Sequence, residues 1–238
     1  MSANVLHHLV APETTVGRLI AADPSGWRAY TEHAFVRGLQ TGTLPLAAFR
    51  AYLVQDYKFL IHFARAWALA AVKAEDPAEI RACAATVHAL IDEELKLHVA
   101  YCRGFGLDER ELLAAPEHPA TTAYTSFVLE RGLSGDLLDL LVALAPCVVG
   151  YGEIGARLAR DPETRLEANP YRQWIETYSG EVYADVARAA SAQLDRVAAA
   201  RIGEPIGRSP RWPGLVATFA RATALEVAFW QMGLDATG

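Results

Sequence analysis

The chain has 238 residues, of which 52% are hydrophobic and 21% are charged, and its formal net charge is −6. This composition is typical of a soluble globular protein, and the length favours one large domain over two. The acidic balance, with no run of lysine or arginine, makes nucleic acid a poor partner. The longest apolar stretch, 137–152, is interrupted by Asp139 and Pro146, so it predicts a buried core helix and no membrane partner.

The expected elements are all helices, because Ala, Leu, Glu and Arg dominate and no strand-like alternation of five or more residues occurs. Residues 1–22 lack the basic start and apolar core of a signal peptide and are expected to form a loose arm. Cap residues, Pro and Gly predict helices over 26–39, 45–73, 77–104, 108–113, 121–131, 134–159, 169–178, 181–200 and 213–232. The chain is therefore expected to be an arm over 1–24 and a single all-α domain, a helical bundle, over 25–238.

The cysteines number three, Cys83, Cys102 and Cys147, without CxxC spacing, which fits reduced thiols in a cytoplasmic protein. Cys147 lies between Pro146 and Tyr151, and a thiol and a phenol four residues apart share one helix face. Proline fits the first turn of a helix, so Pro146 predicts that Cys147 is near a helix start, where amide donors favour the reactive thiolate. An inert buried cysteine is the alternative, and spacing alone favours it.

Two carboxylates sit in strongly apolar helical segments. Asp56, Phe59 and Phe63 fall at i, i+3 and i+7, so the acid shares a face with two aromatic rings. That arrangement suits a flat, nitrogen-rich ligand, although a surface acid is the simpler interpretation. Glu226 is either on a narrow polar stripe or buried in a pocket, where its pKa would rise towards that of a general acid or base.

Four tyrosines are also candidates for a pocket, although tyrosines more often fill helical cores with a locally satisfied hydroxyl. They are Tyr124, Tyr151, Tyr178 and Tyr183.

A third group of polar residues has spacings that could bind a metal on a bundle. His88 and Asp92 are four residues apart, as are Glu94 and His98, with Glu93 between the pairs. The E-x-x-H pair that a di-iron bundle takes from each of two helices is absent, and no second carboxylate/histidine helix matches this one, so a salt-linked surface is the better interpretation. No Walker sequence or G-x-S-x-G occurs, and the G-x-G-x-x-G spacing at 150–155 follows no expected strand, which argues against nucleotide cofactors and a serine hydrolase.

Seven short stretches, in this order and spacing, resemble the TenA/thiaminase II family over residues 27–233. They are His33-Ala-Phe-Val-Arg-Gly-Leu-Gln-Thr-Gly-Thr-Leu-Pro45, Val54-Gln-Asp-Tyr-Lys-Phe-Leu60, Glu94-Leu-Lys-Leu-His98, Tyr124-Thr-Ser126, Pro146-Cys-Val-Val-Gly-Tyr-Gly-Glu153, Trp174-Ile-Glu-Thr-Tyr-Ser-Gly180 and Glu226-Val-Ala-Phe-Trp230.

The resemblance implies a haem-oxygenase-like helical bundle, a homotetramer, and hydrolysis of a small aminopyrimidine without metal or cofactor. In the cysteine-containing branch of the family, 4-amino-5-aminomethyl-2-methylpyrimidine becomes the hydroxymethyl compound plus ammonia, and thiamine is cleaved as well. One pocket position that is tyrosine in some members is Phe59 here, which puts the leaving-group preference in doubt. The resemblance implies a catalytic Cys147 and Glu226, a pyrimidine-binding Asp56, and a pocket of Phe59, Tyr124, Tyr151 and Tyr178.

Three other functions compete with this hydrolase. A pyrimidine-binding or regulatory protein without turnover would arise if Glu226 were misplaced, although direct DNA binding is disfavoured because no helix-turn-helix signal is present. A haem-oxygenase-like metal oxidase would use Glu94 and His98. A cofactor-free oxidase of quinone-cofactor biosynthesis shares the bundle, but the Pro146-Cys147 pair argues against it.

Overall fold

The computed structural model describes residues 9–236 and divides the chain into two compact units. The first unit holds the described residues up to Leu44 together with Leu141–Trp230, and the second holds Pro45–Leu140 with the described residues after Trp230. Every regular element in the described residues is helical, which confirms the all-α prediction.

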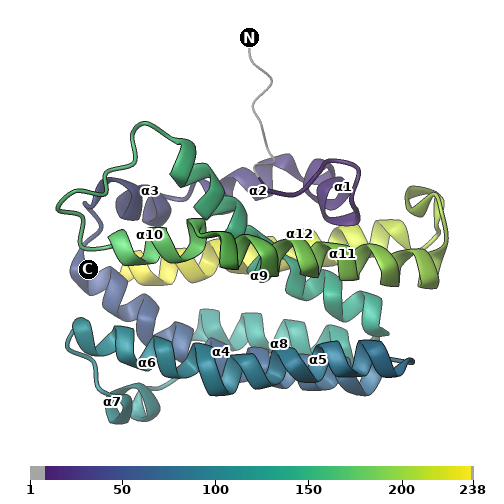
Figure 1. Cartoon of the computed structure of the whole chain (residues 1–238), viewed down its shortest axis with the longest axis horizontal. Helices are drawn as coiled ribbons and strands as arrows, with labels where there is room; N and C mark the ends of the chain where they lie inside the picture. Colours follow the sequence, from purple (N-terminus) through teal and green to yellow (C-terminus); the bar gives the residue numbers. More distant parts are fainter. Residues whose placement is uncertain (1–8, 237–238) are drawn as a thin grey trace. The chain divides into compact units, whose positions relative to one another are not determined.

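The first unit begins with three short helices, α1 (Thr15–Ala22), α2 (Pro24–Thr31) and α3 (Ala34–Thr41), labelled in Figure 1. It continues with most of α9 (Leu137–Arg160), then α10 (Arg172–Ser179), α11 (Glu181–Ile202), a 3₁₀ turn η2 (Ile206–Arg208) and most of α12 (Trp212–Asp235). Aromatic rings fill its core. The rings of Trp27 and Phe219 stack with centroids 5.7 Å apart, and Phe35 stacks on Trp230 at 4.9 Å.

The second unit is built on the long helix α4 (Leu46–Lys73), against which α5 (Pro77–Ala89) and α8 (Pro119–Ser134) pack. A π-helical turn, η1 (Leu90–Glu94), joins α5 to α6 (Leu95–Gly104), and the three run as one nearly continuous rod in Figure 1. The short helix α7 (Glu109–Ala114) follows and is closed by a capping box between Asp108 and Glu111.

Two expected elements are wrong at the N-terminal end. Residues 15–22 form α1, capped by the Thr14 side chain, where a loose arm was expected; residues 1–8 lie outside the described part. The expected helix over 26–39 is divided into α2 and α3 at Glu32 and His33, because the His33 side chain accepts a hydrogen bond from the Phe35 amide and starts a new helix.

Helix α9 is long and apolar enough to cross a membrane by length and composition alone. However, 89% of its most apolar 18-residue window is buried inside the protein. Burial of this kind is what the sequence predicted for a core helix.

Candidate active site

The residues predicted for a site fall into two clusters, each within one unit. The acid cluster belongs to the second unit and contains Asp56, Phe59 and Tyr124. The thiol cluster belongs to the first unit and contains Cys147, Tyr151, Tyr178 and Glu226.

Asp56 lies on α4 and is only 8% exposed. The Tyr52 hydroxyl, one turn earlier on the same helix, donates a hydrogen bond to Asp56 Oδ2 at 3.4 Å. Burial raises the pKa of Asp56 to about 7, and the Tyr52 hydrogen bond offsets only part of that rise. Near neutral pH the carboxyl can therefore exist in either charge state, as a proton donor to a ligand must.

Aromatic rings lie on the same buried face of α4 as this carboxyl. The Phe59 ring stacks on Phe63 with centroids 5.7 Å apart and lies 5.0 Å from the Tyr124 ring of α8. The i, i+3, i+7 spacing predicted that Asp56 shares a face with Phe59 and Phe63, and the buried helix face confirms it. A buried acid beside several rings suits a flat heteroaromatic ligand.

His98 was assigned by its spacing to a surface group, and the structure corrects this. Its Nδ1 atom lies 3.5 Å from Asp56 Oδ2, and its Nε2 atom lies 2.9 Å from the Leu53 carbonyl oxygen. The π-helical turn η1 inserts a residue into the rod before α6, and sequence spacing gives no sign of that shift. The placement of His98 on a salt-linked surface was therefore wrong.

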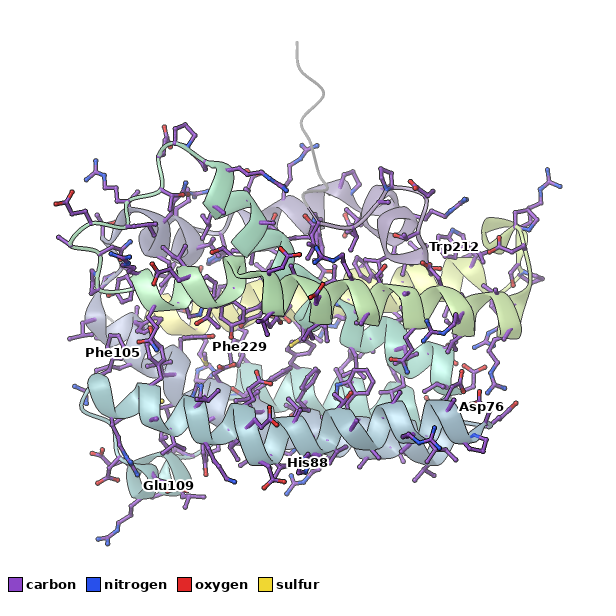
Figure 2. All side chains as sticks on the ribbon, in the orientation of Figure 1. Asp76, His88, Phe105, Glu109, Trp212 and Phe229 are labelled. Carbon is purple, nitrogen blue, oxygen red and sulfur yellow. The ribbon has the colours of Figure 1, made fainter. Side chains whose placement is uncertain are left out.

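His88 and Asp92 behave as the salt-linked surface that was predicted. His88 Nδ1 lies 2.9 Å from Asp92, both side chains are exposed, and Figure 2 shows His88 on the outer side of α5. Within residues 9–236, no group of three or more His, Cys, Asp or Glu side chains has the arrangement needed to hold a metal ion.

The thiol cluster is carried by α9. Cys147 is half-buried, and Tyr151 follows it one turn later on the same face. The predicted position of Cys147 near a helix start is wrong, because Pro146 lies inside α9, whose first residue is Leu137. The helix N-terminus therefore supplies no dipole to the thiolate at Cys147.

Close approach of other segments to α9 shapes this cluster. A Cβ atom added at Gly155 would lie 2.0 Å from the backbone oxygen of Tyr178, so only glycine lets the end of α10 pack there. The Tyr178 ring then lies 4.9 Å from Tyr151 and 4.6 Å from Trp174. The sequence identified Tyr151 and Tyr178 separately, and the structure brings them into contact.

Glu226 lies on α12 and is 2% exposed, so the buried alternative is the correct one. Trp230 follows one turn later, and its ring lies 5.4 Å from the Tyr151 ring. Glu226 therefore lies one helical turn before Trp230, the residue of α12 whose ring contacts Tyr151.

A buried carboxylate that sequence reasoning left without a role is Glu153 on α9, which is 1% exposed. Its Oε1 atom accepts hydrogen bonds from the backbone amides of Leu9 and Val10, at 3.0 and 2.9 Å. A Cβ at the preceding Gly152 would meet the Leu9 side chain at 2.7 Å. This carboxylate thus fixes the segment before α1 onto α9, next to Tyr151.

One groove of about 610 Å³ lies in the second unit, lined by residues that include Arg50, Gln55, Glu117 and His118. None of the predicted site residues lines it. The Gln55 side chain bonds to the Pro116 carbonyl and the His118 amide, so its polar groups already hold the loop before α8.

The fold and the two clusters define a class: an all-helical protein with a buried acid beside aromatic rings and a half-buried thiol beside tyrosines. Its family follows from comparison with known proteins. Residues 24–236 match the model of the TENA/THI-4/PQQC family, and the chain belongs to that family. The resemblance identified from the sequence motifs is thereby confirmed.

Three relatives illustrate the match. A solved structure described as a TenA family transcription regulator from Silicibacter sp. TM1040 is 52% identical, with a TM-score of 0.88 over 92% of this chain and 96% of its own. The aminopyrimidine aminohydrolase of Halalkalibacterium halodurans is 33% identical over 88% of this chain and 90% of its own length. A domain with a heme oxygenase-like fold from Shewanella denitrificans, 16% identical, has a TM-score of 0.70 over 92% of each chain, which confirms the predicted fold.

Proposed function

We propose that this chain hydrolyses 4-amino-5-aminomethyl-2-methylpyrimidine to the hydroxymethyl compound and ammonia, as a step of thiamine salvage. The observation that carries the proposal is the buried Asp56, with a pKa of about 7, beside the rings of Phe59 and Tyr124. Membership of the family and similarity to the aminopyrimidine aminohydrolase of Halalkalibacterium support the same reaction.

Asp56 would bind the edge of the pyrimidine where a ring nitrogen and the amino group are adjacent. That edge presents one acceptor and one donor, and a neutral carboxyl group matches it with one donor and one acceptor. Transfer of the Asp56 proton to the ring nitrogen makes the ring a better electron acceptor. The stacked aromatic rings would hold the pyrimidine plane.

Cys147 would act as the nucleophile. Its thiolate adds to the ring carbon next to the carbon bearing the aminomethyl group, and the electron pair of the broken ring double bond moves onto that neighbouring carbon. This pair then expels the amine, which leaves as ammonia once a proton reaches it. Because Cys147 is not at a helix start, we assign the stabilisation of its thiolate to a tyrosine hydroxyl, with Tyr178 the first choice.

Glu226 would supply and recover that proton. It protonates the departing amine, and as a carboxylate it then takes a proton from the water that adds to the exocyclic methylene. Loss of the thiolate restores the aromatic ring, so the net reaction exchanges the amine for water. Each such proton transfer is typically worth ~10²–10⁴ in rate.

Thiamine cleavage would follow the same route with the thiazole ring as the leaving group. Phe59 provides a stacking surface but no hydroxyl at this position, so we expect the small amine to be the better leaving group. We further propose that the protein works in the cytoplasm as a homotetramer. None of its three cysteines is in a disulfide in the described part, which is in keeping with a reducing compartment.

The test is ammonia release from the aminomethylpyrimidine, measured beside thiamine cleavage with the same protein. The proposal predicts ammonia in stoichiometric amounts with the hydroxymethyl product, and slower cleavage of thiamine. Tight binding of the pyrimidine without turnover would overturn the hydrolase and favour a binding or regulatory protein. Size-exclusion chromatography with light scattering would test the tetramer.

A further inference from the structure

We propose that His98 is a positioning residue for Asp56, which holds the carboxyl group in the neutral form that recognises the pyrimidine edge. This inference rests on the proposed function, since it explains how the ligand-binding acid keeps its proton. His98 lies on α6, its side chain is only 9% exposed, and it bridges two groups of α4.

The first step is the tautomer of the His98 ring. The Leu53 carbonyl oxygen, 2.9 Å from Nε2, can only accept a hydrogen bond, so Nε2 carries the hydrogen. Burial lowers the pKa of His98, and the Leu53 hydrogen bond recovers only part of that loss, so the ring is neutral at neutral pH. Its Nδ1 atom therefore presents a lone pair.

The second step is what that lone pair meets. Nδ1 lies 3.5 Å from Asp56 Oδ2. An ionised Asp56 would place a negative oxygen against the lone pair, whereas protonation of the carboxyl removes that negative charge and most of the repulsion. The neutral imidazole therefore favours the neutral acid. Tyr52 already donates to Oδ2, which His98 also contacts, so the proton of the neutral acid is carried on Oδ1, from where it can be donated to a ligand.

The third step is the charge of the surroundings. No lysine or arginine in the described part of the chain pairs with Asp56. The pKa of Glu94 on η1 is raised to about 7, first by desolvation of its carboxyl group and second by the negative charge of Asp56. The titratable groups that interact with Asp56 are Tyr52 on α4, Glu94 on η1, and His98 and Cys102 on α6. Nearby cations of the same elements bond elsewhere: Arg50 to the Gly106 carbonyl, Lys58 to the Leu113 carbonyl and Lys96 to Asp92.

None of these neighbours stabilises a carboxylate by positive charge. Burial raises the pKa of the Cys102 thiol to about 12, so it remains neutral. His98 is thus the group in this set whose hydrogen-bonding state selects between the two forms of Asp56. A donor in place of its Nδ1 lone pair would favour the carboxylate instead.

The test substitutes His98→Gln. The Gln amide nitrogen can occupy the Nε2 position and keep the bond to Leu53, so the fold is preserved while the lone pair facing Asp56 is removed. His88→Gln is the matched control, because His88 also lies beside an aspartate but on the exposed face of α5.

Two quantities are measured for each protein: the titration midpoint of Asp56 from carboxyl ¹³C shifts, and the binding of the hydroxymethylpyrimidine product against pH. We expect the midpoint in His98→Gln to fall by about one pH unit, with roughly tenfold weaker product binding above neutral pH, and no change in His88→Gln. Titration of the ligand itself is common to all variants and cancels in the comparison.

The outcomes separate the two proposals. An unchanged midpoint in a folded His98→Gln protein, beside a wild type that binds the product, would overturn the role of His98 alone. A wild type that binds no aminopyrimidine would overturn the proposed function and, with it, the purpose assigned to His98. If His98→Gln loses thermal stability, the titration midpoint of Asp56 is measured instead in the wild type with and without product. The proposal expects product binding to raise this midpoint.

Discussion

The acid cluster and the thiol cluster are built by different means. Around Asp56, burial and the hydrogen bond from Tyr52 set the charge state of one carboxyl, which His98 also contacts. Around Tyr151, glycines let separate segments approach α9 until the rings touch. The first cluster should therefore respond most to changes of charge, and the second to the loss of a reactive atom or to added volume.

The largest effect is expected in the thiol cluster. Cys147→Ser should lower kcat for ammonia release by at least about 10³-fold, because serine is a far weaker nucleophile at neutral pH. Steady-state kinetics with the aminomethylpyrimidine measure this. Cys83→Ala, which alters a buried cysteine of α5, is the control and should keep near-native kcat. Near-native activity in Cys147→Ser would exclude covalent catalysis.

In the acid cluster, Asp56→Asn should separate binding from catalysis. The amide keeps one donor and one acceptor, so product binding should stay within about tenfold of wild type, while kcat falls by ~10²–10⁴ because no proton reaches the ring. Asp56→Ala should lose both. Isothermal titration calorimetry and kcat give the two numbers, and equal losses of binding in Asn and Ala would contradict the assigned pairing.

The charge of Asp56 should also appear in stability. Its pKa is raised from 3.8 to about 7 on folding, so the folded state binds the proton more tightly. The stabilisation relative to Asp56→Asn is therefore complete below about pH 4 and is lost as pH rises to about 7, by on the order of 2–4 kcal/mol. Urea unfolding of both proteins between pH 4 and 8 measures the difference, and a difference independent of pH would refute the buried-acid assignment.

A smaller effect is expected from added volume in the thiol cluster. Gly155→Ala places a methyl group against the Tyr178 backbone and should cost about 1–3 kcal/mol of unfolding free energy and displace Tyr178. Gly104→Ala is the matched control, because no atom lies within 4 Å of its added Cβ. Thermal unfolding and kcat of both variants check this. Equal stability of the two would show that Gly155 does not control the approach of α10.

The sequence predicted the acid cluster better than the thiol cluster, for a physical reason. The period of α4 places Asp56 and Phe59 on one face without any knowledge of distant segments. His98 was missed because the π-helical turn before α6 changes which residues face α4, and spacing does not reveal it.

In the thiol cluster, the sequence identified the residues through motifs but not their setting. Pro146 predicted a helix start, yet apolar residues before it continue α9 through the proline and bury the segment. The contact of Tyr151 with Tyr178 depends on Gly155, and the tie from Glu153 to the segment before α1 depends on a fold that joins distant residues. A local sequence pattern does not show which distant segments pack against each other in the fold.

The central claim is that both clusters serve one reaction, and a double-mutant cycle between Asp56→Ala and Cys147→Ala tests it most directly. Groups that act on one transition state have strongly non-additive effects. We predict that kcat/KM for ammonia release by the double variant lies within about tenfold of Cys147→Ala alone. Independent losses that multiply in the double variant would contradict the account, because the two clusters would then act in separate events.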